Sequence, residues 1–154
     1  MKYALGPKSR ARLQGVHPRL VAVVERAIGA TEQDFAVTDG VRTLAQQQVL
    51  VSRGASKTLN SRHLPQPDGY GHAVDLVPFV DGPRWEWPLI YPIAAAMRTA
   101  ARELNVPLVW GGVWDRKLFE LPNTPDALKD AVAAYCLRHP GPDFIDGPHY
   151  QMAL

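Results

Sequence analysis

The stretch SRHLPQPDGYGHAVDLV, residues 61–77, joins a polar segment rich in turn-forming residues to a short apolar run. The apolar run at residues 73–77 has the length of a β-strand and is followed by a proline, but it contains Asp75. A carboxylate inside an apolar strand costs free energy unless it is paired, hydrogen-bonded or bound to a metal. We therefore expect a partner for Asp75, and the residues leave open whether it is an arginine or a metal ion.

Helices and short strands alternate unevenly on both sides of this stretch. Apolar residues at helical spacing predict amphipathic helices, and Thr124 followed by Pro125 is typical of a helix start. The patterns predict helices at residues 18–28, 43–52, 88–104 and 125–137, and strands at residues 34–38, 73–77, 106–110 and 149–152. Short strands joined by long loops indicate an α+β fold, with a small, mostly antiparallel sheet flanked by helices.

Size and composition narrow the class of protein. A chain of 154 residues has the length of one domain, and we expect a monomer. The formal net charge is only +2, which is too little to suggest nucleic acid as a partner. No stretch approaches the roughly 20 apolar residues of a membrane span. The single cysteine, Cys136, excludes an internal disulfide and a zinc site built from several thiolates.

Histidines and a second acid accompany Asp75 in the sequence. His63 lies in the polar segment before it, and the motif DGPH, residues 146–149, stands near the C-terminus. Two histidines and one aspartate make a plausible catalytic zinc set, because such zinc takes three protein ligands and leaves a fourth position for water. Asp146 could then serve as general base. The Gly-Pro pair in this motif predicts a tight turn that lets the Asp146 and His149 side chains converge.

Four segments, in the same order, resemble the motifs of one peptidase family. This is the family of zinc D-Ala-D-Ala carboxypeptidases and L-alanyl-D-glutamate endopeptidases, and the chain is most similar to its phage endolysin subgroup. The segment SRH at residues 61–63, with GHAVD at residues 71–75, resembles the family signature Ser-x-His-x-x-Gly-x-Ala-x-Asp. The other matches are DGVRT at residues 39–43 to Gly-x-Arg-Ser/Thr, VWGGVW at residues 109–114 to Trp-Gly-Gly-x-Trp, and DGPH to acid-x-x-His.

The resemblance implies a metal centre and a fold. His63, Asp75 and His149 would bind Zn²⁺, and Asp146 would orient and deprotonate the attacking water. The implied fold is the α+β architecture that this family shares with the Hedgehog signalling domain.

The resemblance also implies residues that contact the substrate. Arg42 would face the scissile carbonyl or a substrate carboxylate, although it could instead cap the sheet or pair with Asp39. Ser61 would hydrogen-bond the substrate. Trp114 would form a wall of the cleft, or alternatively pack in the core.

The chain departs from the family pattern between His63 and the next motif glycine. Five extra residues lie within LPQPDGY, residues 64–70, whose proline and glycine content suggests a surface loop near the mouth of the cleft. The insertion makes His72 an alternative ligand to His63. However, His72 and Asp75 are an odd number of residues apart on one strand, so their side chains should point to opposite faces. His63 also keeps the Ser-x-His spacing, and we therefore favour it.

The resemblance implies a zinc metallopeptidase with one catalytic domain, residues 1–154, that cuts peptidoglycan stem peptides at the L-Ala–D-Glu bond. Two alternatives stay open: a D,D-carboxypeptidase that removes terminal D-Ala, and a zinc-stabilised module of the cell wall or virion without turnover. Residues 1–8 lack the apolar core of a signal peptide. We expect the protein to accumulate in the host cytoplasm and to reach the wall through a separate lysis pore.

Overall fold

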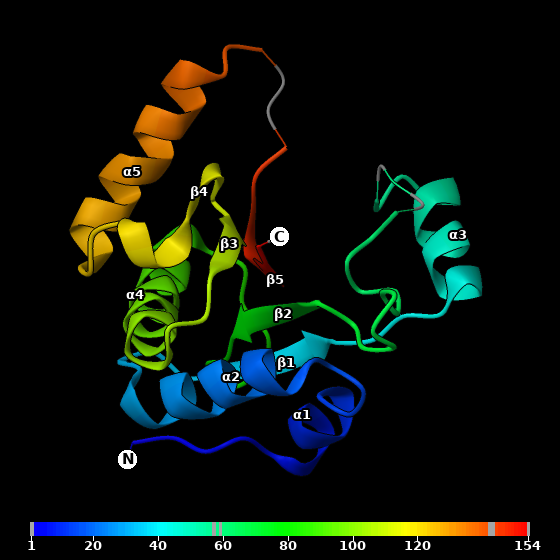
Figure 1. Ribbon diagram of the computed structural model, residues 1–154. Helices are drawn as coiled ribbons and strands as arrows, with labels where there is room; N and C mark the ends of the chain where they lie inside the picture. The colour runs from blue at the N-terminus through cyan, green and yellow to red at the C-terminus, as the bar shows by residue number, and fades with distance from the viewer. Residues whose placement is uncertain (1, 57, 59, 142–143, 154) are drawn as a thin grey trace.

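A computed structural model describes residues 2–56, 58, 60–141 and 144–153 (Figure 1). Within these residues, five strands form one sheet in the order β1-β2-β5-β3-β4, and every neighbouring pair is antiparallel. The strands are β1 (Phe35–Asp39), β2 (Ala73–Pro78), β3 (Leu108–Gly111), β4 (Val113–Lys117) and β5 (Asp146–Met152). The predicted α+β fold with a small antiparallel sheet is confirmed.

Helices flank this sheet, as predicted. They are α1 (Pro7–Arg12), α2 (Pro18–Ala30), α3 (Leu44–Ser52), α4 (Trp87–Leu104), α5 (Pro125–Arg138) and the short 3-10 helix η1 (Leu118–Glu120). Helix α4 packs on β2 and β5, while α2 packs on α4; α1 and α5 contact the edge strands β1 and β4. Helix α3 stands apart from the other helices (Figure 1).

The apolar stripes predicted for α2 and α4 form the core. Leu20 and Val24 of α2, and Met97 of α4, are completely buried. A buried side chain of this size contributes about 1.5–3 kcal/mol relative to an exposed one. The two stripes therefore hold the helices against each other and cover one face of the sheet.

Alternation along the central strands separates this core from the opposite face. In β2, Val74 and Leu76 belong to the core, so Asp75 between them points the other way. In β5, Tyr150 is likewise part of the core, which leaves His149 on the same face as Asp75. The sheet thus presents its charged side chains on the face that α4 does not cover.

Three elements were not predicted, and one predicted turn is wrong. The missed elements are α1, β4 and η1. Strand β5 begins at Asp146, so the expected turn at residues 147–148 is part of a strand. Its pairing with β3 is irregular, because Trp110 pairs with Tyr150 whereas Gly111 pairs with Asp146. This bulge, rather than a turn, sets the spacing of the acid and the histidine in the DGPH motif.

Candidate active site

Strand register brings the central charged side chains into one row. Asp39 at the end of β1 pairs with Asp75 in β2, and Asp75 pairs with His149 in β5. Directly opposed residues of antiparallel strands have neighbouring side chains. The row therefore joins residues that are far apart in the sequence on one face of the sheet.

His63 reaches this row from the loop after α3. Its side chain is almost fully buried, and its Nδ1 lies 2.7 Å from the Gly40 carbonyl oxygen. A neutral ring that donates its Nδ1–H to this carbonyl keeps an unprotonated Nε2. That Nε2 lies 3.3 Å from Asp75 Oδ1, is buried and has no hydrogen-bond partner. An unpartnered lone pair in this position is suited to a metal ion.

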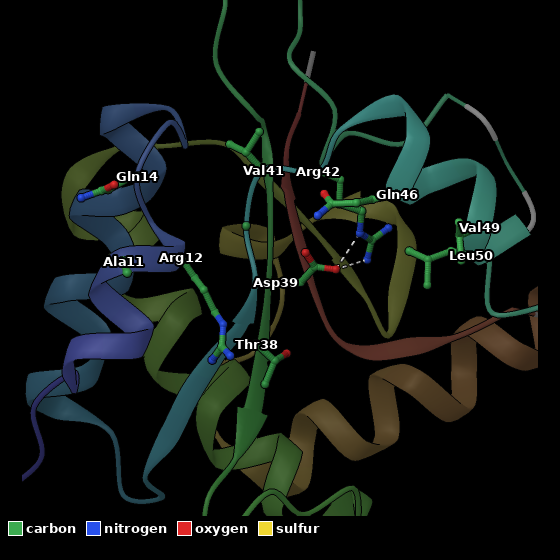
Figure 2. A pocket seen from close by; sticks show the side chains of 11 residues that line it. Ala11, Arg12, Gln14, Thr38, Asp39, Val41, Arg42, Gln46, Val49 and Leu50 are labelled. Carbon is green, nitrogen blue, oxygen red and sulfur yellow. Dashed lines mark hydrogen bonds and ion pairs between the residues drawn. The ribbon is translucent and has the colours of Figure 1, made fainter.

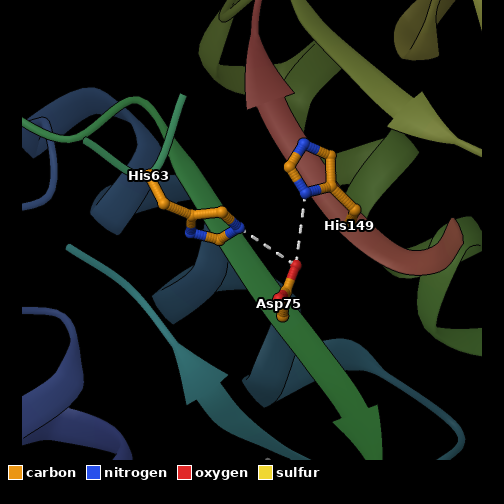
Figure 3. A group of neighbouring side chains, drawn as sticks. All are labelled: His63, Asp75 and His149. Atoms are coloured by element: carbon orange, nitrogen blue, oxygen red, sulfur yellow. Dashed lines mark hydrogen bonds and ion pairs between the residues drawn. The ribbon is translucent and has the colours of Figure 1, made fainter. Parts of the chain in front are cut away.

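His149 completes the group on the other side of Asp75 (Figure 3). Its Nδ1 lies 3.2 Å from Asp75 Oδ1, and its Nε2 lies 2.9 Å from Gln151 Oε1. Ligand atoms of His63, Asp75 and His149 all lie within 4.8 Å of one another. Two imidazoles and one carboxylate form a donor set that zinc accepts. The residues present therefore fit a metal ion of this kind.

The charges of this group favour a cation between its members. Burial acts to raise the pKa of Asp75, but His149 and His63 outweigh burial and hold the pKa well below its usual range. Burial acts to lower the pKa of His149, but Asp75 and other acceptors raise it by more. The site thus keeps a carboxylate that attracts positive charge, whether on a protonated imidazole or on a metal.

Arg42 provides the arginine partner that the sequence left open for Asp75. Its Nη2 lies 3.4 Å from Asp75 Oδ2, so the arginine contacts one carboxylate oxygen and the two histidines contact the other. Arg42 also donates to Asp39 Oδ2 at 2.6 Å through Nε and to Gln47 Oε1 at 2.9 Å through Nη1. The pairing with Asp39, considered as an alternative role for Arg42, is thus present in the structure.

Arg42 lines two pockets. The larger, about 550 Å³, lies between α1, the end of β1 and α3, and Figure 2 shows Arg42 bonded to Asp39 at its edge. The smaller, about 380 Å³, is lined by two of the predicted metal ligands, His63 and His149, and by Asp146. It is lined by Arg42, Ala55, Ser56, Thr58, Asn60, Ser61, Arg62, His63, Trp114, Phe144, Asp146, His149 and Gln151. We call this smaller space the catalytic pocket because it adjoins the histidine and aspartate group.

Asp146 lies in the catalytic pocket beside that group. Burial, followed by the nearby charge of Asp75, raises the pKa of Asp146, while His149, His63 and Arg42 act in the opposite direction. Gly111 sets its position, since a Cβ at Gly111 would lie only 2.0 Å from the Asp146 carbonyl oxygen. Only glycine permits this close approach of β3 and β5.

Ser61 and Trp114 are also brought to the catalytic pocket. The buried Ser61 accepts a hydrogen bond from the His63 amide at 3.1 Å through its hydroxyl. Trp114 is half-buried, with its ring centroid 5.3 Å from that of His149, and its Nε1 donates to the Phe144 carbonyl at 2.7 Å. Trp114 thus lines the pocket and also packs against the hydrophobic core, and its contact with substrate stays a prediction.

His72 lies away from the group, next to the insertion. Its Nε2 is 2.7 Å from Asp68 Oδ2, and its ring contacts that of His17 edge-on at 5.5 Å. The insertion itself folds back as a short loop, in which Gln66 and Tyr70 are joined by a backbone hydrogen bond of 2.8 Å. The geometry accordingly places His63, and not His72, beside Asp75.

Sequence reasoning missed two glutamines at the site. Gln47 is completely buried and connects Arg42 to the loop that lines the pocket, since its Nε2 donates to Ser56 Oγ at 2.9 Å and to the Thr58 carbonyl at 2.6 Å. Gln151 bonds to His149. The one signal in the sequence that could have identified Gln151 is its position two residues after His149 on a strand, because the side chains of such residues lie on the same face.

Comparison with known proteins identifies the family. The model of the phage L-alanyl-D-glutamate peptidase family matches residues 1–131. The L-alanyl-D-glutamate peptidase of Escherichia phage T5 is 28% identical over 121 residues, which cover 75% of this chain and 84% of that protein. The crystal structure of the Serratia marcescens L-Ala D-Glu endopeptidase ChiX matches with a TM-score of 0.71 and 33% identity, covering 99% of this chain and 92% of that chain. These matches confirm the resemblance read from the motifs: the chain belongs to the phage L-alanyl-D-glutamate peptidase family.

Proposed function

We propose that this chain is a zinc-dependent endopeptidase that hydrolyses the L-Ala–D-Glu bond in the stem peptides of bacterial peptidoglycan. The observation that carries the proposal is the convergence of His63, Asp75 and His149 beside a pocket that Asp146 and Arg42 also line. The bond is inferred from the names of the two relatives, an L-alanyl-D-glutamate peptidase and an L-Ala D-Glu endopeptidase.

His63, Asp75 and His149 would hold the zinc. Three protein ligands are the pattern of a catalytic rather than a structural zinc site, which has four. Bound zinc would lower the pKa of a water molecule to about 7 and polarise the substrate carbonyl.

Asp146 would act as the general base and then as the general acid. It would accept the proton of the attacking water and later donate it to the amine of D-Glu as the peptide bond breaks. Burial raises the pKa of Asp146, which brings the carboxyl nearer to the range in which a group both takes up and releases a proton.

Arg42 would direct its guanidinium at the scissile carbonyl oxygen or at a substrate carboxylate. Asp39 and Gln47 hold this side chain before substrate arrives, and a charge fixed in advance does not have to reorganise during the reaction. Ser61 would hydrogen-bond the substrate, and Trp114 would form a wall against which the stem peptide lies.

Product analysis on purified peptidoglycan tests the activity. An L-Ala–D-Glu endopeptidase leaves L-Ala on the glycan and releases stems with a new amino-terminal D-Glu. A D,D-carboxypeptidase would release free D-Ala, and a binding module without turnover would release neither product. Free D-Ala alone, or no product from zinc-loaded protein, would contradict the proposal.

Zinc content tests the metal site. We expect about one zinc per chain, lost in His63→Ala, Asp75→Ala and His149→Ala. The matched control is His72→Ala, because this histidine precedes the same strand but bonds to Asp68 instead. Stoichiometric zinc in all three ligand variants would show that the site is wrong, and loss of zinc only in His72→Ala would favour the alternative ligand.

We further propose that the protein acts as a monomer and reaches the wall through a separate pore. Among the described residues, no helix is long and apolar enough to cross a membrane. The route is tested by fractionating cells that express the untagged chain, with and without a pore-forming lysis protein. Efficient export without the pore would contradict it, and the solution mass of the purified protein tests the monomer.

A further inference from the structure

Gln151 is the outer hydrogen-bond partner of His149. It follows His149 by two residues in β5, so both side chains lie on the same face of the sheet. Its Oε1 lies 2.9 Å from His149 Nε2. Gln151 is half-buried and lines the catalytic pocket.

This contact decides which nitrogen of His149 is free. An amide oxygen can only accept, so His149 donates its Nε2–H to it, and the neutral ring keeps an unprotonated Nδ1. That Nδ1 lies 3.2 Å from Asp75 Oδ1, a separation that either a ring proton or a cation can bridge. A metal cation there would be bound by the lone pair of Nδ1 and by the carboxylate oxygen.

His63 has the same arrangement with a different outer partner. Its Nδ1 lies 2.7 Å from the Gly40 carbonyl oxygen, and its Nε2 faces Asp75. Each histidine therefore has an oxygen acceptor on its outer nitrogen and a lone pair on its inner nitrogen. The acceptor for His63 is backbone and cannot be removed by substitution, whereas the acceptor for His149 is a side chain.

We propose that Gln151 is a positioning residue that holds His149 in the tautomer and orientation needed to bind the metal through Nδ1. The inference rests on the proposed metal centre and adds a residue to it. Outer partners of ligating histidines typically change metal affinity by about 10–100-fold when removed. Gln151 should therefore contribute to metal affinity without touching the metal.

The competing role for Gln151 is contact with substrate, because its side chain lines the pocket. The two roles differ in what they change. A substrate contact would raise KM and leave metal affinity unaltered, while a positioning residue changes metal affinity in the absence of any substrate.

The experiment measures zinc dissociation constants by competition with a chromophoric chelator at fixed pH, for the full chain and three variants. Gln151→Leu removes the acceptor and should weaken zinc binding by about 10–100-fold. Gln151→Glu keeps an acceptor oxygen and should bind zinc at least as tightly as the wild type. Gln48→Leu, an exposed glutamine of α3, is the matched control and should leave affinity unchanged.

Melting temperatures of the metal-free proteins separate positioning from loss of structure. We expect metal-free Gln151→Leu to have the same melting temperature as the metal-free wild type. If its melting temperature is lower, Gln151→Met, which has a flexible side chain of similar length, is used in its place. Cobalt absorption spectra provide a second readout, in which Gln151→Leu should alter the ligand-field bands and Gln151→Glu should restore them.

Each other outcome overturns the inference in a recognisable way. If Gln151→Leu binds zinc as tightly as the wild type, the positioning role is wrong but the metal centre stands. If the same variant also has a raised KM, Gln151 contacts the substrate. Equal losses in the Leu and Glu variants would show that an acceptor is not what matters. If the wild type itself binds no zinc, the proposed metal centre fails and the inference fails with it.

Discussion

Asp146 is the residue whose proposed role can be tested most sharply. Asp146→Asn keeps the shape of the side chain but cannot take up the proton of the attacking water. We expect turnover to fall by about 10²–10⁴-fold, the usual contribution of a positioned base. Zinc should remain, since His63, Asp75 and His149 are unchanged. The measurement is the turnover on purified stem peptides together with the zinc content of the same preparation.

Two other outcomes would assign Asp146 differently. Near-normal turnover would contradict the base and leave Asp146 a structural residue of the bulge between β3 and β5. Loss of turnover together with loss of zinc would make Asp146 a metal ligand. Lost turnover with retained zinc and an unchanged melting temperature is the result that supports the base.

Arg42→Lys should not behave as a conservative change. The guanidinium reaches Asp39 through Nε and Gln47 through Nη1 at the same time, and an ammonium on a flexible stem cannot reproduce this planar fork. A hydrogen bond to a charged group contributes about 1.5–3 kcal/mol, so we expect kcat/KM to fall by roughly 10–100-fold. The matched control is Arg84→Lys, in an exposed ion pair with Glu86; wild-type kinetics in Arg42→Lys would remove Arg42 from the site.

At the scale of the element, the pairing of β3 with β5 depends on a glycine. A Cβ at Gly111 would lie 2.0 Å from the Asp146 carbonyl oxygen, so Gly111→Ala must push the strands apart. Overpacking of this kind costs about 1–3 kcal/mol, and we expect the melting temperature to fall by several degrees. Differential scanning calorimetry checks this against Gly6→Ala, whose Cβ meets nothing within 4 Å.

Activity should fall in Gly111→Ala as well, because Asp146 moves with its strand. Equal melting temperatures for the Gly111 and Gly6 variants would contradict the argument.

The elements differ in how far local sequence predicts them. Helices α2 and α4 bury apolar stripes, and their periodicity alone predicted their positions within a few residues. Strand β4 carries three consecutive exposed residues, so it shows no apolar pattern and forms because β3 pairs with it. Helix α1 has only six residues, too few for periodicity to be visible.

At the scale of the whole molecule, one charge cluster joins the C-terminal end of α5 to β4. Asp115 of β4 accepts from Arg138 at 2.9 and 3.1 Å, and His139 Nε2 lies 3.0 Å from it. The pKa of Asp115 is lowered to about 2, chiefly by its hydrogen bonds with Arg138. Burial acts in the opposite direction, and His139 lowers the pKa further. The Asp115 carboxylate therefore takes up a proton less readily in the folded protein than in the unfolded chain.

The sign of the pH dependence follows from that difference. A carboxyl group with a lowered folded-state pKa contributes stability above its unfolded value, near 3.8, and loses it as the pH falls through about 2. We expect Asp115→Asn to lower the midpoint of urea unfolding at pH 6 and to lower it much less at pH 2. The control is Asp130→Asn, an exposed acid of α5, and an equal effect of both variants at every pH would contradict the prediction.

Local sequence determined the types of the main elements and the chemistry of the candidate site. Apolar periodicity and turn residues act between near neighbours, which is why α2, α4 and β2 could be predicted without the structure. Asp75 identified the centre of the site because a carboxylate inside an apolar strand needs a partner, and this is visible from its immediate neighbours in the sequence. His63, His149 and Asp146 followed as a plausible zinc set with a spare acid, and the family resemblance supported them and added Arg42.

Only the tertiary structure decided how these residues meet. The pairing of Asp75 with His149 depends on strand register between segments 74 residues apart, and a shift by one residue would turn one side chain to the other face. The bulge between β3 and β5 that replaces the predicted turn arises from the same long-range pairing. Gln47 and Gln151 instead lie near their partners in the sequence, five residues from Arg42 and two residues from His149. Side-chain hydrogen bonds of this kind leave no periodic pattern in a sequence, because their formation depends on how the folded backbone orients the two groups.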